Sequence, residues 1–183
     1  ISEEDEESKE YTTIIEQGSN HLLQLVDNVL ELSSLDSGTP ILTDIKVEIN
    51  ALCRQWMEKA KNSLKSGVEL VYQPGQDELH LYTNPERLTQ VVSHLLHNSA
   101  RFTEKGSITL SWHINPKQRA LVISVTDTGI GIPQDKQDFV FERFAKIDTF
   151  STGTGLGLAL GRLIMEKMNG SLMLDDKYTE GCR

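Results

Sequence analysis

Hydrophobic residues recur with a helical period along the first part of the chain. From Ser2 to about Leu35 the repeat is carried by Ile15, Leu22, Leu25, Val29 and Leu32. Their steps of seven, three, four and three residues place them on one helix face, and the sequence Ser37-Gly38-Thr39-Pro40 ends the helix. The stripe is narrow, and a lone helix is marginally stable in water. We therefore expect this face to pack on partner helices of a bundle or coiled coil, with packing on its own domain as the alternative.

After residue 40 the pattern alternates between strand-like and helix-like segments. Strands are predicted at 41–49, 68–72, 79–82, 107–114, 120–126 and 171–174. Helices are predicted at 50–63, from 85 to at least 96, and at 156–168. Asn50 and Asn84 are the expected N-caps of the first two, and Pro85 suits a first helical position. The strands on either side of Asn115-Pro116-Lys117 predict an antiparallel hairpin. Helices combined with an antiparallel or mixed sheet predict a two-layer α/β sandwich behind one long helix.

Composition places the chain among globular domains and narrows its partners. It has 183 residues, 38% of them hydrophobic, enough for one domain and an appended element. The net charge is −9 and Lys and Arg form no dense cluster, which argues against nucleic acid as a partner. Cys53 and Cys182 fit neither a metal-ligand pattern nor a disulfide framework, which indicates a reducing compartment. Without a membrane-length apolar run or a signal peptide, we expect a cytoplasmic piece of a longer protein, without direct membrane contact.

Two segments carry polar residues that could hold an anionic ligand. One interrupts the hydrophobic pattern of a predicted helix, and the other follows a predicted strand. Asn98 and Arg101 are three residues apart on an otherwise apolar helix, so they share a face. An amide oxygen can ligate Mg²⁺ and a guanidinium can pair with phosphate. Asp127 ends a strand, where it could accept a hydrogen bond from an amine, and Gly129 and Gly131 let the backbone approach a ligand. Taken singly, the two segments also fit a solvated helix end and a glycine-rich turn.

Two further segments follow. The stretch from Phe139 to Phe144 contains three aromatic residues and suggests a hydrophobic anchor for a movable segment, with plain core packing as the alternative. The second segment, Gly153-Thr154-Gly155-Leu156-Gly157, opens a helix, and free N–H groups at a helix N-terminus bind phosphate. This second segment matches neither the P-loop nor the dinucleotide fingerprint.

The order and spacing of these four segments resemble the ATP-binding domain of sensor histidine kinases. The segments correspond to the N box, the first glycine box, the aromatic F box and the second glycine box of that family. The resemblance runs from residue 40 to 183, and residues 11–38 resemble the second helix of the family's dimerisation hairpin. It therefore implies two parts: a hairpin helix at 1–38, and a catalytic domain of the histidine-kinase and gyrase type at 40–183.

The resemblance also implies roles for the matched residues. Asn98 would ligate Mg²⁺ on the ATP phosphates, and Arg101, where the family usually has lysine, would contact phosphate. Phe102 would lie near the adenine or ribose, and Asp127 would accept from the adenine amine beside the turn at the first glycine box. Residues 134–154 would form a lid over the nucleotide. The anchors of the lid and the residues against the phosphates would be Phe141, Phe144, Gly153, Thr154, Gly155, Leu156 and Gly157.

Three positions depart from the family pattern. His94 stands where many members have asparagine, Ser99 replaces the usual alanine, and Thr152 replaces a frequent lid glycine. The acceptor context of the family is also absent around the five histidines, His21, His80, His94, His97 and His113.

The implied function is transfer of the γ-phosphoryl group of ATP to a histidine outside this chain. That group would then pass to an aspartate on the receiver domain of a response regulator. The parent protein would be a homodimer through its hairpin helices, and other segments could anchor it in the inner membrane. The alternatives are an ATPase of gyrase or mismatch-repair type, which uses a glutamate where this chain has His94, and a non-enzymatic nucleotide-binding or dimerisation module.

Overall fold

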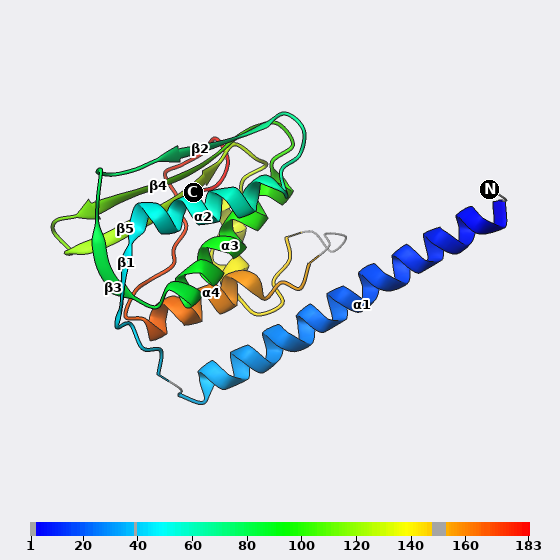
Figure 1. Cartoon of the computed structure of the whole chain (residues 1–183), viewed down its shortest axis with the longest axis horizontal. Coiled ribbons are helices and arrows are strands. Elements are labelled where there is room, and N and C mark those ends of the chain that lie inside the picture. Colours follow the sequence, from blue (N-terminus) through cyan, green and yellow to red (C-terminus); the bar gives the residue numbers. More distant parts are fainter. Residues whose placement is uncertain (1–2, 39, 148–152) are drawn as a thin grey trace.

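The computed structural model describes residues 3–38, 40–147 and 153–183 and shows an α/β domain from which one long helix projects (Figure 1). The helices are α1 (Glu3–Asp36), α2 (Ile49–Lys61), α3 (Pro85–Phe102) and α4 (Gly157–Lys167), with short 3-10 turns η1 (Gln134–Lys136) and η2 (Phe139–Phe141). The strands are β1 (Ile45–Glu48), β2 (Val68–Gln73), β3 (His80–Thr83), β4 (Gly106–Asn115) and β5 (Ala120–Asp127). No helix in the described part of the chain is long and apolar enough to cross a membrane.

The strands form two sheets. One has the order β2-β4-β5, with β2 parallel to β4 and β4 antiparallel to β5, and the other pairs β1 with β3. The predicted hairpin is confirmed, with Asn115 opposite Ala120 at its turn and Ile108 opposite Asp127 at its open end. This register places Asp127 at the end of the sheet away from the turn, where the chain leaves β5 for the loop that follows.

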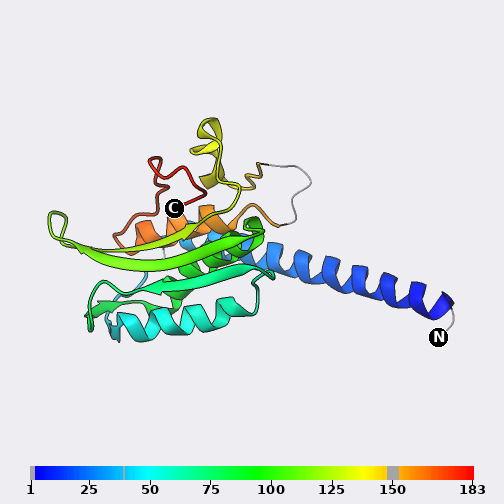
Figure 2. The same ribbon diagram turned by 90° about the horizontal axis from the view of Figure 1, so that it is seen from above.

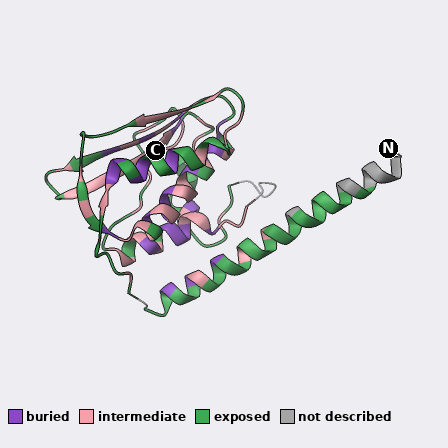
Figure 3. Ribbon diagram, viewed as in Figure 1, coloured by how far each residue is buried: buried purple, intermediate pink, exposed green. Residues whose placement is uncertain are grey.

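The helices pack in a layer against the mixed sheet, which confirms the predicted two-layer sandwich (Figure 2). Helices α2 and α3 contribute Trp56, Val92 and Leu96 to a core shared with Ile108 and Leu110 of β4. Helix α4 lies on α3, and buried residues concentrate where these helices meet the sheet and one another (Figure 3).

The hydrophobic stripe of α1 is divided between two environments. Ile15 and Leu22 are 67% and 62% exposed, and Val29 is 45% exposed, whereas Leu32 is only 5% exposed. Leu25 is partly buried against the same cluster as Leu32. The expectation that partner helices rather than the chain's own domain would cover the stripe is therefore wrong for Leu25 and Leu32. The cause is a hydrophobic contact with α3 and α4, made by Val91, Leu156, Leu160 and Ile164.

Polar contacts accompany this packing of α1. Glu31 forms an ion pair with Arg87 at the start of α3, and Gln90 donates to the other carboxylate oxygen of Glu31 at 2.6 Å. Asn28 donates to the hydroxyl of Thr154 at 3.4 Å, and Asp36 pairs with Arg143 at 2.6 Å. The last three turns of α1 thus contact both helices and two separate parts of the loop region.

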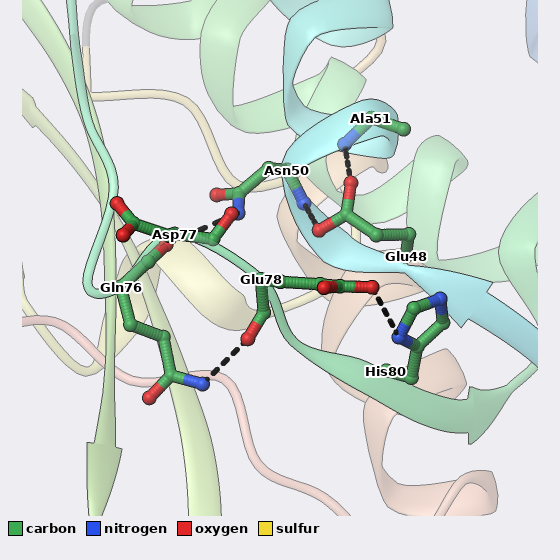
Figure 4. A network of polar contacts seen from close by, with 7 residues as sticks. All are labelled: Glu48, Asn50, Ala51, Gln76, Asp77, Glu78 and His80. Carbon is green, nitrogen blue, oxygen red and sulfur yellow. Dashed lines mark hydrogen bonds and ion pairs between the residues drawn. The ribbon is translucent and has the colours of Figure 1, made fainter.

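The start of α2 differs from the prediction. The N-cap is Glu48, whose carboxylate accepts from the backbone N–H groups of Asn50 at 2.9 Å and Ala51 at 2.6 Å (Figure 4). Asn50 is instead buried, and its amide donates to the carbonyls of Gln76 and Asp77 at 3.1 and 2.9 Å. Asn50 is therefore used to hold the loop before β3, which leaves the neighbouring carboxylate to cap the helix.

The predicted N-cap of α3 is confirmed, whereas the predicted last strand is wrong. The Asn84 side chain accepts from the N–H of Arg87 at 3.0 Å, with Pro85 at the first helical position. Residues 171–174 keep the alternation of a strand, with Leu172 partly buried and Met173 71% exposed, but they form no strand. Within the described residues no neighbouring strand pairs with this segment, and a strand needs such a partner for its backbone hydrogen bonds.

Candidate functional site

Four predicted segments meet around one cleft of about 1730 Å³. The C-terminal half of α3, the end of β5, the loop after β5 and the start of α4 all contribute to its walls, and the cleft continues along β5 toward the hairpin turn. The predicted site residues that line it are Asn98, Arg101, Phe102, Asp127, Gly131, Phe141, Gly153, Thr154, Gly155 and Gly157. The fold thus brings residues from positions 98 to 157 of the sequence to one place.

Asp127 lies at the base of the cleft and is 5% exposed. Its Oδ1 accepts from the backbone N–H groups of Gly129 at 3.0 Å and Cys182 at 3.2 Å, and its Oδ2 accepts from the Ser99 hydroxyl at 2.7 Å. Burial and the nearby Asp127 carboxylate raise the pKa of the Cys182 thiol to about 12. Because a buried carboxylate is stable only with such donors, the surroundings of Asp127 are built to hold a fixed acceptor at this point.

The N box and the second glycine box are in contact through Arg101. The guanidinium lies 4.9 Å from the ring centre of Phe102. A Cβ atom added at Gly153, where φ is +124°, would lie 2.5 Å from Nη1 of Arg101. Only glycine suits this backbone conformation, and its missing side chain leaves the space that Arg101 occupies.

The first glycine box is fixed against the C-terminal end of α3 in a similar way. A Cβ atom at Gly129 would lie 2.6 Å from the carbonyl oxygen of Phe102, so a side chain there would push the loop away from α3. Gly129 itself does not line the cleft; its N–H group orients Asp127.

The N-terminus of α4 is open to an anion. Leu156 at the N-cap makes no side-chain capping bond to the first turn of the helix. The N–H of Leu156 donates to Thr154 at 3.2 Å, and the N–H groups that follow at the start of a helix lack partners within the helix. The predicted phosphate-binding role of this segment therefore fits its geometry, with the backbone as the donor.

His94 faces the same helix start. A Cβ atom at Gly157 would lie 3.6 Å from the imidazole ring. Nδ1 is buried and has no hydrogen-bond partner among the described residues. Burial lowers the pKa of His94, an effect that the neighbouring backbone of Gly157 only partly offsets. A half-buried imidazole with a lowered pKa therefore lies beside the open end of α4.

The aromatic segment is held in place differently from the expectation. Phe141 is half-buried, with the Arg162 guanidinium 4.6 Å from its ring centre, and Val140 beside it is buried. Phe144, the other expected anchor, is 60% exposed and borders a small cavity next to α1 instead of the cleft. Leu156 is fully buried and packs between α4 and α1, so only its backbone can serve the site. The Thr152 position of the predicted lid lies outside the described residues.

Two contributors to the site cannot be predicted from the sequence. Ser99 departs from the family pattern, but its hydrogen bond to Asp127 depends on the packing of α3 against β5. Cys182 contributes its backbone, since its N–H and C=O exchange hydrogen bonds with the backbone of Asp127 at 3.2 and 2.8 Å. No local sequence signal marks a backbone contact of this kind.

Residues 83–183 match the family described as histidine kinase-, DNA gyrase B-, and HSP90-like ATPase, and the chain belongs to this family. These residues run from the end of β3 to the end of the chain, and so include α3, Asp127 and α4.

The similar proteins indicate a narrower group within this family. The circadian input-output histidine kinase CikA of Synechococcus elongatus is 30% identical over 185 residues, which cover 96% of this chain and 24% of that protein. Two-component system protein A of Emericella nidulans is 33% identical over 177 residues, which cover 91% of this chain and 26% of that protein. The crystal structure of full-length ShkA in complex with AMPPNP matches with a TM-score of 0.84 at 28% identity, over 96% of this chain and 37% of that one. The predicted ATP-binding domain of a sensor histidine kinase is thereby confirmed, and the chain spans about a quarter of the length of the two curated relatives.

Proposed function

We propose that this chain binds ATP with Mg²⁺ and forms the catalytic region of a cytoplasmic protein-histidine kinase. The γ-phosphoryl group of ATP would go to a histidine outside this chain and then to an aspartate on a response-regulator receiver domain. The observation that carries the proposal is that the fixed, buried Asp127 carboxylate and the open N-terminus of α4 lie on the same cleft. Residues 1–38 would be the second helix of a dimerising hairpin and residues 40–183 the catalytic domain.

The nucleotide would lie along the cleft with its base at Asp127. The carboxylate would accept from the adenine amine, with Phe102 beside the base and the first glycine box following the turn. The phosphates would meet Arg101 and the backbone N–H groups of 153–157, where a helix start favours negative charge. Phe141 would help to close the loop region over them.

Asn98 is the protein ligand proposed for Mg²⁺. It lines the cleft on α3 one turn before Arg101, and its amide oxygen is a hard ligand of the kind that Mg²⁺ prefers. No group of three His, Cys, Asp or Glu side chains gathers into a metal site anywhere in the described ranges. A single amide therefore fits a metal that is mostly held by phosphate and water. When bound, Mg²⁺ would neutralise phosphate charge, while Arg101 and the helix start hold the phosphates in position.

The site favours phosphoryl transfer to an external acceptor over ATP hydrolysis of the gyrase type. That hydrolysis uses a carboxylate to activate water at the position of His94. His94 is instead a largely buried imidazole whose pKa is lowered by burial. The histidine kinases among the similar proteins support the same choice.

The proposal is tested by binding and by labelling in one preparation. Calorimetry is expected to show ATP and ADP binding that Mg²⁺ strengthens. Incubation with γ-labelled ATP is expected to leave this chain without acid-labile label, because none of its five histidines has the acceptor context. Label should appear on an added acceptor hairpin from the parent protein. Absence of nucleotide binding would refute the proposal, and acid-labile label on the chain itself would place the acceptor within it.

Replacement of Asn98 by alanine should remove most of the Mg²⁺ enhancement of ATP binding. Residues that merely support a metal ligand change metal affinity by about 10- to 100-fold, and loss of a direct ligand should do at least as much. Metal-free ADP binding should be nearly unchanged, because the base contact at Asp127 remains. The measurement is calorimetry with and without Mg²⁺, and Asn20→Ala on the exposed surface of α1 is the control. Equal Mg²⁺ enhancement in Asn98→Ala and the parent would exclude Asn98 as the ligand.

A further inference from the structure

Ser99 is a buried residue of α3 at the contact between this helix and the end of β5. It follows Asn98 in the sequence, but its side chain is 5% exposed and points to the end of β5. Its hydroxyl donates to Oδ2 of Asp127 at 2.7 Å, and both groups are buried. Ser99 therefore contacts the one carboxylate at the base of the cleft that is proposed to read the nucleotide base.

The two oxygens of Asp127 are not equally occupied. Oδ1 accepts from two backbone N–H groups, those of Gly129 and Cys182, whereas Ser99 is the one donor to Oδ2 among the described residues. A carboxylate has about four lone-pair sites, two on each oxygen. Both sites on Oδ1 are used, so the acceptor left for a ligand is on Oδ2, the atom to which Ser99 is bonded.

We infer that Ser99 is a specificity-determining residue that, together with Oδ2 of Asp127, selects a 6-amino purine over a 6-oxo purine. This inference rests on the proposed nucleotide site. Ser99 also lines the cleft, and because its hydroxyl proton is committed to Oδ2, its oxygen would offer lone pairs to a ligand beside the free site on Oδ2. An exocyclic amine donates to this pair of acceptors. A carbonyl at the same position faces two acceptors, and the hydroxyl can turn toward it only by leaving the buried carboxylate with one donor fewer.

A purely structural role for Ser99 would have a different signature. Suppose that Ser99 served only to satisfy a buried carboxylate. Its loss would then lower the melting temperature and weaken the binding of every purine nucleotide by the same factor. A role in base selection changes the ratio between nucleotides that differ only at carbon 6. The ratio is therefore the quantity to measure.

The experiment compares ATP, purine riboside triphosphate, which has hydrogen at carbon 6, and inosine triphosphate, which has oxygen there. Dissociation constants are measured by calorimetry for the parent and for Ser99→Ala, Ser99→Cys and Ser99→Thr, together with melting temperatures. Ser93→Ala, on the same helix and outside the cleft lining, is the matched control. Ser99→Cys keeps the shape of the side chain with a weak donor, and so provides the test if Ser99→Ala does not fold.

Ser99→Ala and Ser99→Cys should lower the affinity for ATP by about 3- to 10-fold, the range for loss of one hydrogen bond. The affinity for purine riboside triphosphate should stay nearly unchanged. The preference for ATP over both analogues should fall by that factor, whereas Ser99→Thr and Ser93→Ala should keep it. Equal weakening of all three nucleotides, or an unchanged ratio, would overturn the inference. Failure of the parent to bind any nucleotide would overturn the proposed function itself, which is a different result.

Discussion

Asp127→Asn should lower the affinity for ATP by about 10- to 150-fold, which corresponds to about 1.5–3 kcal/mol for a hydrogen bond to a charged group. The carboxylate is buried and already receives two backbone N–H groups on Oδ1. These donors would hold the amide oxygen of an asparagine at the Oδ1 position. The amide nitrogen would then occupy the Oδ2 position and present a donor to the donating amine of adenine.

The same geometry predicts a change of base preference. A donor at the Oδ2 position suits a purine with a carbonyl at carbon 6, so Asp127→Asn should bind inosine triphosphate more tightly than the parent does. Ser99 can adapt, because its hydroxyl can accept as well as donate.

Calorimetric titration with both nucleotides measures the two effects in one protein. Asp135→Asn, the same chemical change at an exposed position of η1, is the control and should alter neither affinity. Unchanged ATP affinity in Asp127→Asn would remove Asp127 from the base-binding site.

Leu32→Ala should destabilise the packing of α1 on the domain by about 2–5 kcal/mol, the usual range for a buried leucine. Leu32 is 5% exposed and packs with Val91, Leu160 and Ile164. Truncation would leave a cavity between α1 and the two helices that it covers. Leu30, on the same helix, is 63% exposed, so Leu30→Ala provides a matched control that should change stability by only a few tenths of a kcal/mol.

The readouts are chemical unfolding and amide hydrogen exchange of residues 25–36. Leu32→Ala should speed exchange in this segment, whereas Leu30→Ala should leave it close to the parent. If both variants behave alike, the end of α1 does not depend on its contact with α3 and α4, and residue 40 would mark a boundary between independently stable parts.

The sequence predicted those features that depend on local chemistry and missed those that depend on tertiary neighbours. Asn84 and Pro85 marked the start of α3 because capping is a local interaction. Glu48 and Asn50 are both able to cap, and the choice between them is made by the distant carbonyls of Gln76 and Asp77. The alternation at 171–174 was present without a partner strand among the described residues, so the pattern alone could not decide the structure.

The site shows the same division. The motifs identified Asn98, Arg101 and Asp127, and the fold brings all three to one cleft. The contribution of Ser99 could not be read from the sequence, because the bond to Asp127 joins residues 28 positions apart. The exposure of Phe144 could not be read from the sequence either, since hydrophobicity does not reveal which side of a loop faces the protein.

Only the C-terminal part of α1 is docked on the domain, so a tilt of the helix moves its free N-terminal end much further than its docked end. Its contacts with the loop region lie between Asn28 and Asp36, whereas residues 3–24 extend beyond the domain for ~33 Å at ~1.5 Å per residue (Figure 1). A tilt of about 10° about the middle of the docked segment would move the free end by ~8 Å but shift each end of the docked segment by only ~1 Å, as follows from the helical rise. A shift of that size is enough to break the 3.4 Å hydrogen bond from Asn28 to Thr154. A large, weak displacement at the far end of the helix is thus converted into a small displacement beside the second glycine box.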